Sequence, residues 1–287
     1  MMRVAVVGAR GQLGATIVRE FSRGHGVTAL DRSMLDVTDA PSVEKIIERA
    51  RPDVIINCTG YNAVDAAEDH PVEAIAVNGL AVLSLARAAQ SLDAALVHFG
   101  SDFVFDGSSR VPYSEEDRPS PCSVYAVSKL LGEWFAEDAP RAYVLRVESL
   151  FGGVDHAALG RGSVAAIVGG LRAGKAVKAF VDRTVSPTFV VDAARATREL
   201  LERQAAPGLY HCVNSGFCTW LEFAEEAARQ LGVEPRIEPV ALADARLRAA
   251  RPLFCALSNR KLQTVGIEMP SWQDALARYL AARVEIS

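Results

Sequence analysis

Cysteine is scarce in this sequence, and its pattern argues against two common kinds of stabilising site. Five cysteines occur in 287 residues, an odd number, and no C-x-x-C pair is present. Disulfide frameworks and zinc sites both depend on paired or clustered cysteines. We therefore expect free, buried thiols in a reducing compartment, which here means the cytoplasm.

Long apolar runs and a strong net charge are also missing. No stretch approaches the roughly 18 consecutive apolar residues of a membrane span, and the apolar run at the N-terminus is too short for a signal-peptide core. The net charge is −4, which gives no reason to expect a nucleic-acid or anionic-membrane partner. The five histidines are scattered without metal-ligand spacing, so we expect no metal. What remains is a globular composition, half of it apolar and 23% charged.

The first half of the chain alternates short strand-like runs with longer helical ones. Apolar runs predict strands over residues 3–7, 27–30, 53–57, 95–99 and 142–146. Apolar residues at helical spacing predict helices from Leu13, over 42–50, over 71–91 and around Tyr125. Strands that alternate with helices form a parallel sheet covered on both faces, so the pattern predicts a Rossmann-type, doubly wound α/β fold.

A glycine-rich loop lies between the first predicted strand and the first predicted helix. Gly8, Gly11 and Gly14 fit the pattern G-x-x-G-x-x-G. The first glycine permits a tight turn, the second lets backbone approach a pyrophosphate, and the third lets the helix pack closely on the sheet. An ordinary strand–helix turn would explain a lone match equally well. Here the position within the first 15 residues favours a dinucleotide site.

The residue that would contact the adenosine ribose is Asp31, at the end of the second predicted strand. An acid at this position favours NAD, because it can bind the ribose hydroxyls. Arg32 follows it directly and Arg10 lies in the glycine loop, and either could hold the 2′-phosphate of NADP. The choice between NADH and NADPH stays open.

The regular alternation of elements ends near residue 150, which suggests a second unit. Glycines cluster between 152 and 174, and later elements are less regular. We predict an NAD(P)-binding domain over 1–150, with 176–195 returning to it, and a smaller substrate-binding lobe made mainly from 151–287.

Three residues could meet at the carboxyl edge of the predicted sheet. The strand at 95–99 leads to Ser101, and Tyr125 and Lys129 lie four residues apart, on one face of a helix. Hydride delivery to a ketone builds negative charge on its oxygen, which Ser101 could hydrogen-bond and Tyr125 could protonate. A nearby cation lowers a tyrosine pKa by roughly 1–3 units, and we expect Lys129 to supply it. The simpler alternative is a core tyrosine beside a solvated lysine.

These segments resemble the extended short-chain dehydrogenase/reductases and, more narrowly, the dTDP-4-dehydrorhamnose reductase family. The resemblance covers nearly the whole chain. It rests on GARGQLG (8–14), LDVTD (35–39), RPDVIINCTGYNAVDAAE (51–68), SDFVFDG (101–107), PYSEED (112–117), VYAVSKLLGE (124–133), SPT (186–188), GLYHCVNSG (208–216) and ARPLFCALSNRKL (250–262).

The resemblance implies reduction of the C4 ketone of a dTDP-4-keto-6-deoxysugar by NADPH or NADH in dTDP-L-rhamnose biosynthesis. It implies catalysis by Tyr125, Lys129 and Ser101, and sugar contacts from Ser101 and Asp102. The cofactor contacts implied in addition to Gly8 and Gly14 of the loop are Gly11, Gln12, Leu13, Asp31, Asp36, Val37, Gly60, Tyr61, Asn62, Tyr125 and Lys129.

The expected sugar pocket departs from the family pattern. Ser149 stands where the family carries a substrate-contacting tryptophan, and an aromatic lost there removes contact worth about 1–2 kcal/mol. Arg183 and Val185 replace a glutamine and a glycine. Among the later arginines, Arg251 is the best candidate for the substrate diphosphate, with a surface role as the alternative. The resemblance therefore supports reductase chemistry more firmly than it supports rhamnose as the product.

Two other functions stay open on these residues. A regulatory subunit like the β subunit of methionine adenosyltransferase shares an SDYVFDG-like segment and acts by binding a partner enzyme. A nucleotide-sugar epimerase would keep its NAD tightly bound between half-reactions. A 4,6-dehydratase is disfavoured, because Asp102 is followed by Phe103 and not by the acid that water elimination needs. The oligomeric state is open, with a homodimer as one option.

Overall fold

The core of the protein is a six-stranded parallel sheet. In the computed structural model, which describes residues 1–153 and 162–284, the strand order is β10-β5-β4-β3-β1-β2. Every neighbouring pair in this sheet is parallel. The strands are β1 (Arg3–Val7), β2 (Gly26–Leu30), β3 (Val54–Asn57), β4 (Ala95–Ser101), β5 (Arg141–Val147) and β10 (Gly208–His211). The predicted doubly wound fold is confirmed.

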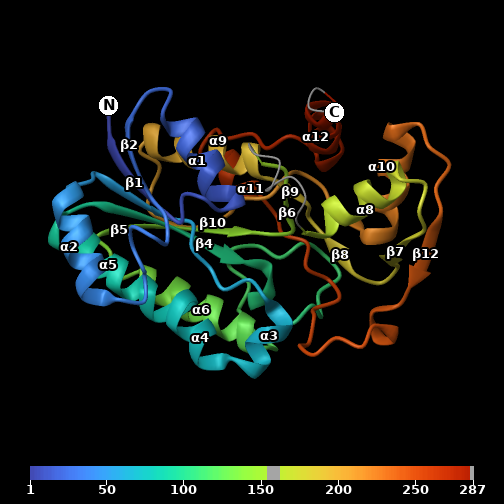
Figure 1. Ribbon diagram of the computed structural model, residues 1–287, viewed down its shortest axis with the longest axis horizontal. Helices are drawn as coiled ribbons and strands as arrows, with labels where there is room; N and C mark the ends of the chain where they lie inside the picture. Colours follow the sequence, from blue (N-terminus) through green and yellow to red (C-terminus); the bar gives the residue numbers. More distant parts are fainter. Residues whose placement is uncertain (154–161, 285–287) are drawn as a thin grey trace.

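Helices cover both faces of the sheet, as Figure 1 shows. Side chains alternate along β1, so Val6 enters one apolar cluster while Ala5 and Val7 enter the other. The first cluster is closed by α1 (Gln12–Phe21) and α9 (Val190–Glu202). The second lies under α2 (Ala40–Ala50) and α5 (Ala81–Ser91), with α6 (Val124–Ala136) packed beside α5.

The predicted helix over 71–91 is continuous but not uniform. It runs from α4 (Pro71–Ile75) through a π-helical turn, η1 (Ala76–Leu80), into α5, and α3 (Val64–Asp69) precedes it. By length and composition this stretch could cross a membrane, with a mean hydropathy of 1.5 in its most apolar window. Half of that window is buried inside the fold, as expected for a core helix of a packed domain.

A second group of elements lies beyond the carboxyl edge of the sheet (Figure 1). Here β7 (Val177–Phe180) pairs in parallel with β12 (Ile237–Val240), and β8 (Thr184–Val185) pairs with β11 (Cys218–Thr219). A separate apolar core holds this group together, with Phe151, Phe223 and Trp272 at its centre. The remaining elements are β6 (Leu150–Phe151), β9 (Thr188–Phe189), α8 (Gly162–Arg172), α10 (Trp220–Leu231), α11 (Arg260–Thr264), α12 (Trp272–Val284) and the 3₁₀ turns η2 (Asp102–Val104) and η3 (Leu242–Asp244).

The chain returns to the main sheet later than the sequence suggests. Of the segment 176–195, β7 stays in the smaller group with β12, while α9 packs against α1. Strand β10 then pairs with β5 and completes the sheet. The exact division into two domains stays a prediction, with the return shifted to α9 and β10.

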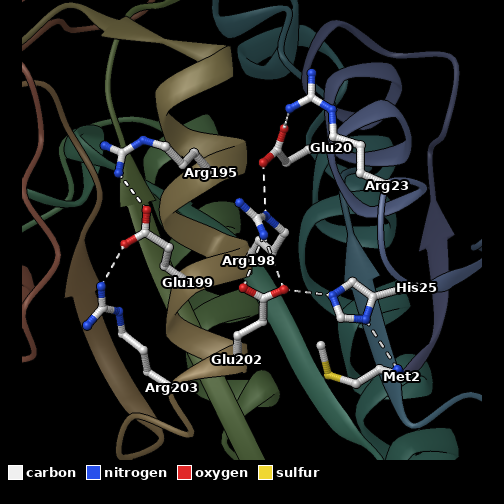
Figure 2. Close-up of polar contacts among 9 residues, drawn as sticks. All are labelled: Met2, Glu20, Arg23, His25, Arg195, Arg198, Glu199, Glu202 and Arg203. Atoms are coloured by element: carbon white, nitrogen blue, oxygen red, sulfur yellow. Dashed lines mark hydrogen bonds and ion pairs between the residues drawn. The ribbon is translucent and has the colours of Figure 1, made fainter.

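Ion pairs reinforce the packing of α9 on α1, as Figure 2 shows. Arg198 Nε on α9 lies 2.9 Å from Glu20 Oε1 on α1, and the same guanidinium bonds Glu202. His25 Nε2, just before β2, lies 3.1 Å from Glu202 Oε1. Because Arg198 and Glu202 keep 32% and 38% of their side chains exposed, each pair contributes little by itself, about 0–1 kcal/mol.

Candidate active site

A cavity of about 480 Å³ lies at the carboxyl edge of the sheet, where ligands of open α/β folds bind. Its wall is made by both groups of elements, from the β1–α1 loop to Trp220 at the start of α10. The predicted site residues in this wall are Gly11, Gln12, Leu13, Asn62, Ser101, Asp102, Tyr125, Lys129, Ser149 and Arg251.

The glycine loop lies at one end of the cavity, and each of its three glycines is required for a different structural reason. Gly8 has φ of 81°, which a residue with a side chain rarely adopts. A Cβ on Gly14 would lie 2.2 Å from the Gly8 carbonyl oxygen, so only glycine lets α1 approach the loop this closely. Gly11 lines the cavity and is the N-cap of α1, where no side chain bonds the first turn. These uncapped N–H groups suit a phosphate.

The predicted ribose-binding acid is already engaged. Asp31 Oδ1 accepts a hydrogen bond from Ser33 N at 2.8 Å, and Oδ2 lies 2.8 Å from Arg10 Nε. The Ser33 hydroxyl, with its N–H and Arg10 assisting, lowers the pKa of Asp31. Arg10 keeps 82% of its side chain exposed at this corner, beyond the end of β2.

The other predicted cofactor residues lie outside the cavity wall. Asp36 accepts from Thr38, and the backbone of Tyr61 pairs with the buried side chain of Asn78. The predicted positions that are absent from the wall are Gly8, Gly14, Asp31, Asp36, Val37, Gly60 and Tyr61. Their contact with a cofactor stays a prediction.

Ser101, Tyr125 and Lys129 come together as predicted from order and spacing. Ser101 is the last residue of β4, and Tyr125 and Lys129 share the face of α6 that lines the cavity. Ser123 caps α6 by accepting a hydrogen bond from Ala126 N at 3.2 Å, which fixes where the helix begins. The Ser101 hydroxyl lies close enough to the Tyr125 phenol to lower its pKa, and it donates a hydrogen bond to Asp102 Oδ1 at 3.1 Å. All three side chains are buried.

The predicted electrostatic role of Lys129 is wrong for this structure. Burial raises the pKa of Tyr125 to about 12, against a lowering by Ser101, while Asp102 raises it further. Among the described residues, Lys129 is not one of the groups that shift it. Burial also lowers the pKa of Lys129 to about 8, and its Nζ donates to the Phe99 carbonyl oxygen at 2.6 Å. Desolvation therefore outweighs the cation that the spacing led us to expect.

A buried charged cluster beside Ser101 was not predicted from sequence. Asp102 and Glu148 are 3% and 2% exposed, and Arg183 lies close enough to shift the pKa of each. Arg183 Nη2 lies 4.0 Å from Cys255 Sγ, and its guanidinium stacks over Phe103 at 5.3 Å. Burial raises the pKa of Asp102 to about 6 and that of Glu148 well above its usual range. The one sequence signal was an acid directly after an apolar strand, in RVES.

The cavity wall contains the aromatic residue Trp220, which comes from another element than the one that carries Ser149. Ser149 lines the cavity with φ of 45°, and Trp220 of α10 lines it as well. Arg251 also lines it, and Asp65 holds both terminal nitrogens of its guanidinium at 2.9 Å. A bidentate pair of this kind fixes the direction of the guanidinium.

Comparison with known proteins places these features in one family. A family profile described as the RmlD substrate binding domain matches residues 2–284. The chain is 36% identical over 289 residues to the dTDP-4-dehydrorhamnose reductase of Mycobacterium tuberculosis, covering 98% of this chain and 93% of that one. It is 31% identical over 285 residues to the spore coat polysaccharide biosynthesis protein SpsK of Bacillus subtilis, covering 99% and 98%.

Solved structures give the same picture. The dTDP-4-dehydrorhamnose reductase of Bacillus anthracis in complex with NADP has a TM-score of 0.92 and 29% identity, covering 98% of this chain and 99% of that one. The UDP-glucose 4-epimerase of Thermus thermophilus in complex with NAD has a TM-score of 0.83 at 22% identity, covering 98% of each chain. The second likeness concerns the fold alone.

Proposed function

The chain belongs to the RmlD substrate-binding-domain family, and on that premise we propose that it reduces the C4 ketone of a dTDP-4-keto-6-deoxysugar with NADPH or NADH. The substrate we propose is dTDP-4-dehydrorhamnose, which makes the protein an oxidoreductase of dTDP-L-rhamnose biosynthesis. One observation carries the proposal: the uncapped start of α1 and the Ser101–Tyr125 pair line the same cavity.

The cofactor half of the cavity fits a dinucleotide. A bound NADPH or NADH supplies the hydride for the ketone. The backbone of Gln12 and Leu13, in the first turn of α1, offers N–H groups to a pyrophosphate, and the close packing of Gly14 on Gly8 keeps that end of α1 in place. Lys129 also lines the cavity, and its ammonium donates a hydrogen bond to the Phe99 carbonyl oxygen.

The chemistry at the ketone oxygen belongs to Ser101 and Tyr125. As negative charge develops on that oxygen, the Ser101 hydroxyl stabilises it by donating a hydrogen bond. Tyr125, whose pKa of about 12 keeps it protonated, donates the proton that completes the alcohol. Neither residue needs a metal for these roles.

The sugar nucleotide fits the other half of the cavity. Arg251, fixed by Asp65, is suited to a phosphate of the dTDP group. Trp220 offers an apolar ring where Ser149 leaves space, and Asp102 offers an acceptor for a sugar hydroxyl. Of the positions that depart from the family pattern, Ser149 and Arg183 line the cavity on the side that we assign to the sugar, whereas Val185 is buried outside its wall.

The test is a direct assay. Purified protein is given NADPH or NADH with dTDP-4-dehydrorhamnose, and the absorbance of the reduced cofactor is followed. We expect stoichiometric loss of absorbance. A purely regulatory protein would show no turnover, and an epimerase would carry tightly bound NAD on purification and consume no added NADPH. Either result would overturn the proposal.

A further inference from the structure

Two buried carboxyl groups, those of Asp102 and Glu148, lie close together beside Ser101. One oxygen of each has a partner: Asp102 Oδ1 accepts from Ser101 Oγ at 3.1 Å, and Glu148 Oε2 accepts from Ser186 N at 2.6 Å. The other oxygens, Asp102 Oδ2 and Glu148 Oε1, have no hydrogen-bond partner among the described residues. Ligand atoms of the two carboxyls and of Cys255 lie within 4.8 Å of one another.

The charges of this cluster do not balance unless a proton is present. Two carboxylates would share the single guanidinium of Arg183 in a nearly dry environment, which leaves one negative charge uncompensated at high cost. One proton between the carboxyls removes that charge and turns an unpartnered acceptor into a donor. The titratable or charged groups that influence the pair, or are influenced by it, are Arg183, Cys255, Cys218 and Tyr125.

A metal ion would be the other way to satisfy these atoms, but the cluster already holds a cation. Arg183 Nη2 lies 4.0 Å from Cys255 Sγ, so a divalent ion bound by that sulfur would sit against a guanidinium. The thiol is also a poor ligand here, because burial raises the pKa of Cys255 well above its usual range and keeps it protonated. The geometry therefore favours a proton over a metal.

We propose that Asp102 and Glu148 share one proton and that this pair is the proton reserve of the reduction, an inference that rests on the proposed reductase function. When Tyr125 gives its proton to the new C4 alkoxide, the Ser101 hydroxyl proton passes to the phenolate oxygen. Asp102, which accepts the Ser101 hydrogen bond at Oδ1 in the resting state, then takes up the shared proton and passes it to the Ser101 oxygen, so that this hydrogen bond reverses during the step. The pair ends as two carboxylates beside Arg183 and takes one proton back from water before the next turnover.

This relay explains how a tyrosine that is hard to ionise can act as the donor. Burial raises the pKa of Tyr125 to about 12, so a phenolate left in the cavity would be unstable. The relay moves the negative charge from Tyr125 to the carboxyl pair. The pKa of Asp102, about 6, is closer to neutral pH than that of Tyr125, and the guanidinium of Arg183 lowers it. Asp102 touches Ser101 and is the relay residue, while Glu148 acts through Asp102 and is a positioning residue.

The shared proton can be observed without turnover. Infrared difference spectra of the full-length protein, taken over a pH titration, should show the carbonyl stretch of a buried protonated carboxyl at pH 7. Glu148→Gln keeps the shape and the acceptor for Ser186 N but removes the like charge. Asp102 then faces only Arg183, becomes ionised at pH 7, and the band disappears. Asp102→Asn should also remove the pair and shift the band.

A matched variant separates the proton from a metal. Cys255→Ala removes the sulfur that a metal would need and should leave the carboxyl band in place. Metal analysis of the purified wild type should find no stoichiometric ion. A bound metal that is lost in Cys255→Ala, or a wild type without the band at pH 7, would overturn the proposal.

The pH dependence of turnover tests the link to catalysis. We expect kcat to fall as rising pH removes the shared proton, and we expect this limb to move about one pH unit toward acid in Glu148→Gln. At pH values above the transitions of both the wild type and Glu148→Gln, the variant should therefore have a kcat about tenfold lower, with KM little changed. At low pH its kcat should approach that of the wild type.

A variant that is equally slow at every pH would show that Glu148 has only a structural role, and would overturn the relay. Thermal unfolding checks that the variant is folded. The infrared band concerns the carboxyl pair alone, whereas the absence of turnover in the wild type counts against the proposed function. The two failures can therefore be told apart.

Discussion

The two halves of the cavity wall are built in different ways. The half assigned to the cofactor comes from short continuous segments, the β1–α1 loop, the end of β4 and the first turns of α6. The half assigned to the sugar comes from single residues far apart in sequence, such as Ser149, Arg183, Trp220 and Arg251. A site made from local motifs resists change in its chemistry, whereas one assembled from distant side chains can change its substrate by single substitutions.

The largest effect, on kcat, should come from substitution of Tyr125, which lies where the two halves of the cavity wall meet. Tyr125→Phe removes the proton donor, and we expect kcat to fall about 100- to 10,000-fold with little change in cofactor affinity. Turnover and a separate fluorescence titration with NADPH measure the two effects. Tyr143→Phe deletes a buried hydroxyl that bonds the Ala205 carbonyl far from the cavity, and it should keep its activity. If both variants are equally active, Tyr125 is not the donor.

The next largest effects should come from two substitutions in the glycine loop, one of which changes stability and the other cofactor binding. A Cβ on Gly14 would meet the Gly8 backbone at 2.2 Å, so Gly14→Ala should lower the free energy of unfolding by about 2–3 kcal/mol. A Cβ on Gly11 would meet the same oxygen only at 3.3 Å. Gly11→Ala should therefore fold normally but bind NADPH more weakly, because its methyl group enters the cavity. Denaturant unfolding and cofactor titration test both, and equal stabilities would contradict this division.

A smaller effect, on the pH dependence of the free energy of unfolding, should come from Asp102 on the sugar side of the cavity. Burial raises the pKa of Asp102 to about 6, so the folded state holds this proton more tightly than the unfolded state. The stability that this group contributes is full below its ordinary pKa and is lost as the pH rises through about 6. Each pH unit between the folded and unfolded pKa values corresponds to about 1.4 kcal/mol.

Glu148→Gln removes the second buried carboxyl, whose pKa is raised by burial and by the neighbouring Asp102. We expect it to be no more stable than the wild type at pH 5, where the pair holds its proton. At pH 8 we expect it to be more stable by about 1–2 kcal/mol. Chemical denaturation at the two pH values makes the comparison. A difference that does not vary with pH would contradict the charge account.

The smallest effect concerns the choice of cofactor. Arg10 is exposed beside Asp31, at the corner where the ribose of a dinucleotide would lie. We expect Arg10→Ala to raise KM for NADPH about fivefold, the cost of one exposed ion pair of about 1 kcal/mol, and to leave KM for NADH nearly unchanged. Arg23→Ala, which removes another exposed arginine paired with one acid, is the control. A parallel rise for both cofactors would show that Arg10 does not contact a 2′-phosphate.

The first half of the fold was predictable because its signals are local. Apolar runs and helical spacing identify the strands and helices of the sheet up to β5, and G-x-x-G-x-x-G and Tyr-x-x-x-Lys locate the ends that face the cavity. The sequence led us to expect the chain to return to the first domain at residues 176–195, whereas it returns with α9 and β10. Strand pairing between residues 144 and 209 cannot be recognised from either segment alone. The short strands of the smaller group have too few residues to show a period.

The electrostatics of the site could not be predicted, for a related reason. The spacing of Tyr125 and Lys129 shows that they share a helix face but not that the ammonium turns to the Phe99 carbonyl. The meeting of Asp102 with Glu148 and Arg183 depends on a contact distant in sequence, in which Ser186 N, just after β8, bonds Glu148, just after β5, and burial then decides the pKa values. The sequence marks Arg183 as an unusual residue, and only the fold shows what it neutralises.

The central claim is that hydride goes to C4 of the sugar in this cavity while the proton comes through Tyr125. Turnover of dTDP-4-dehydrorhamnose with NADPH that carries deuterium at both C4 positions of the nicotinamide, followed by NMR of the product, tests this transfer. We expect one carbon-bound deuterium, at C4 of the sugar, and none there when ordinary NADPH is used in heavy water. Deuterium that is missing from C4, or that enters C4 from the solvent, would contradict it.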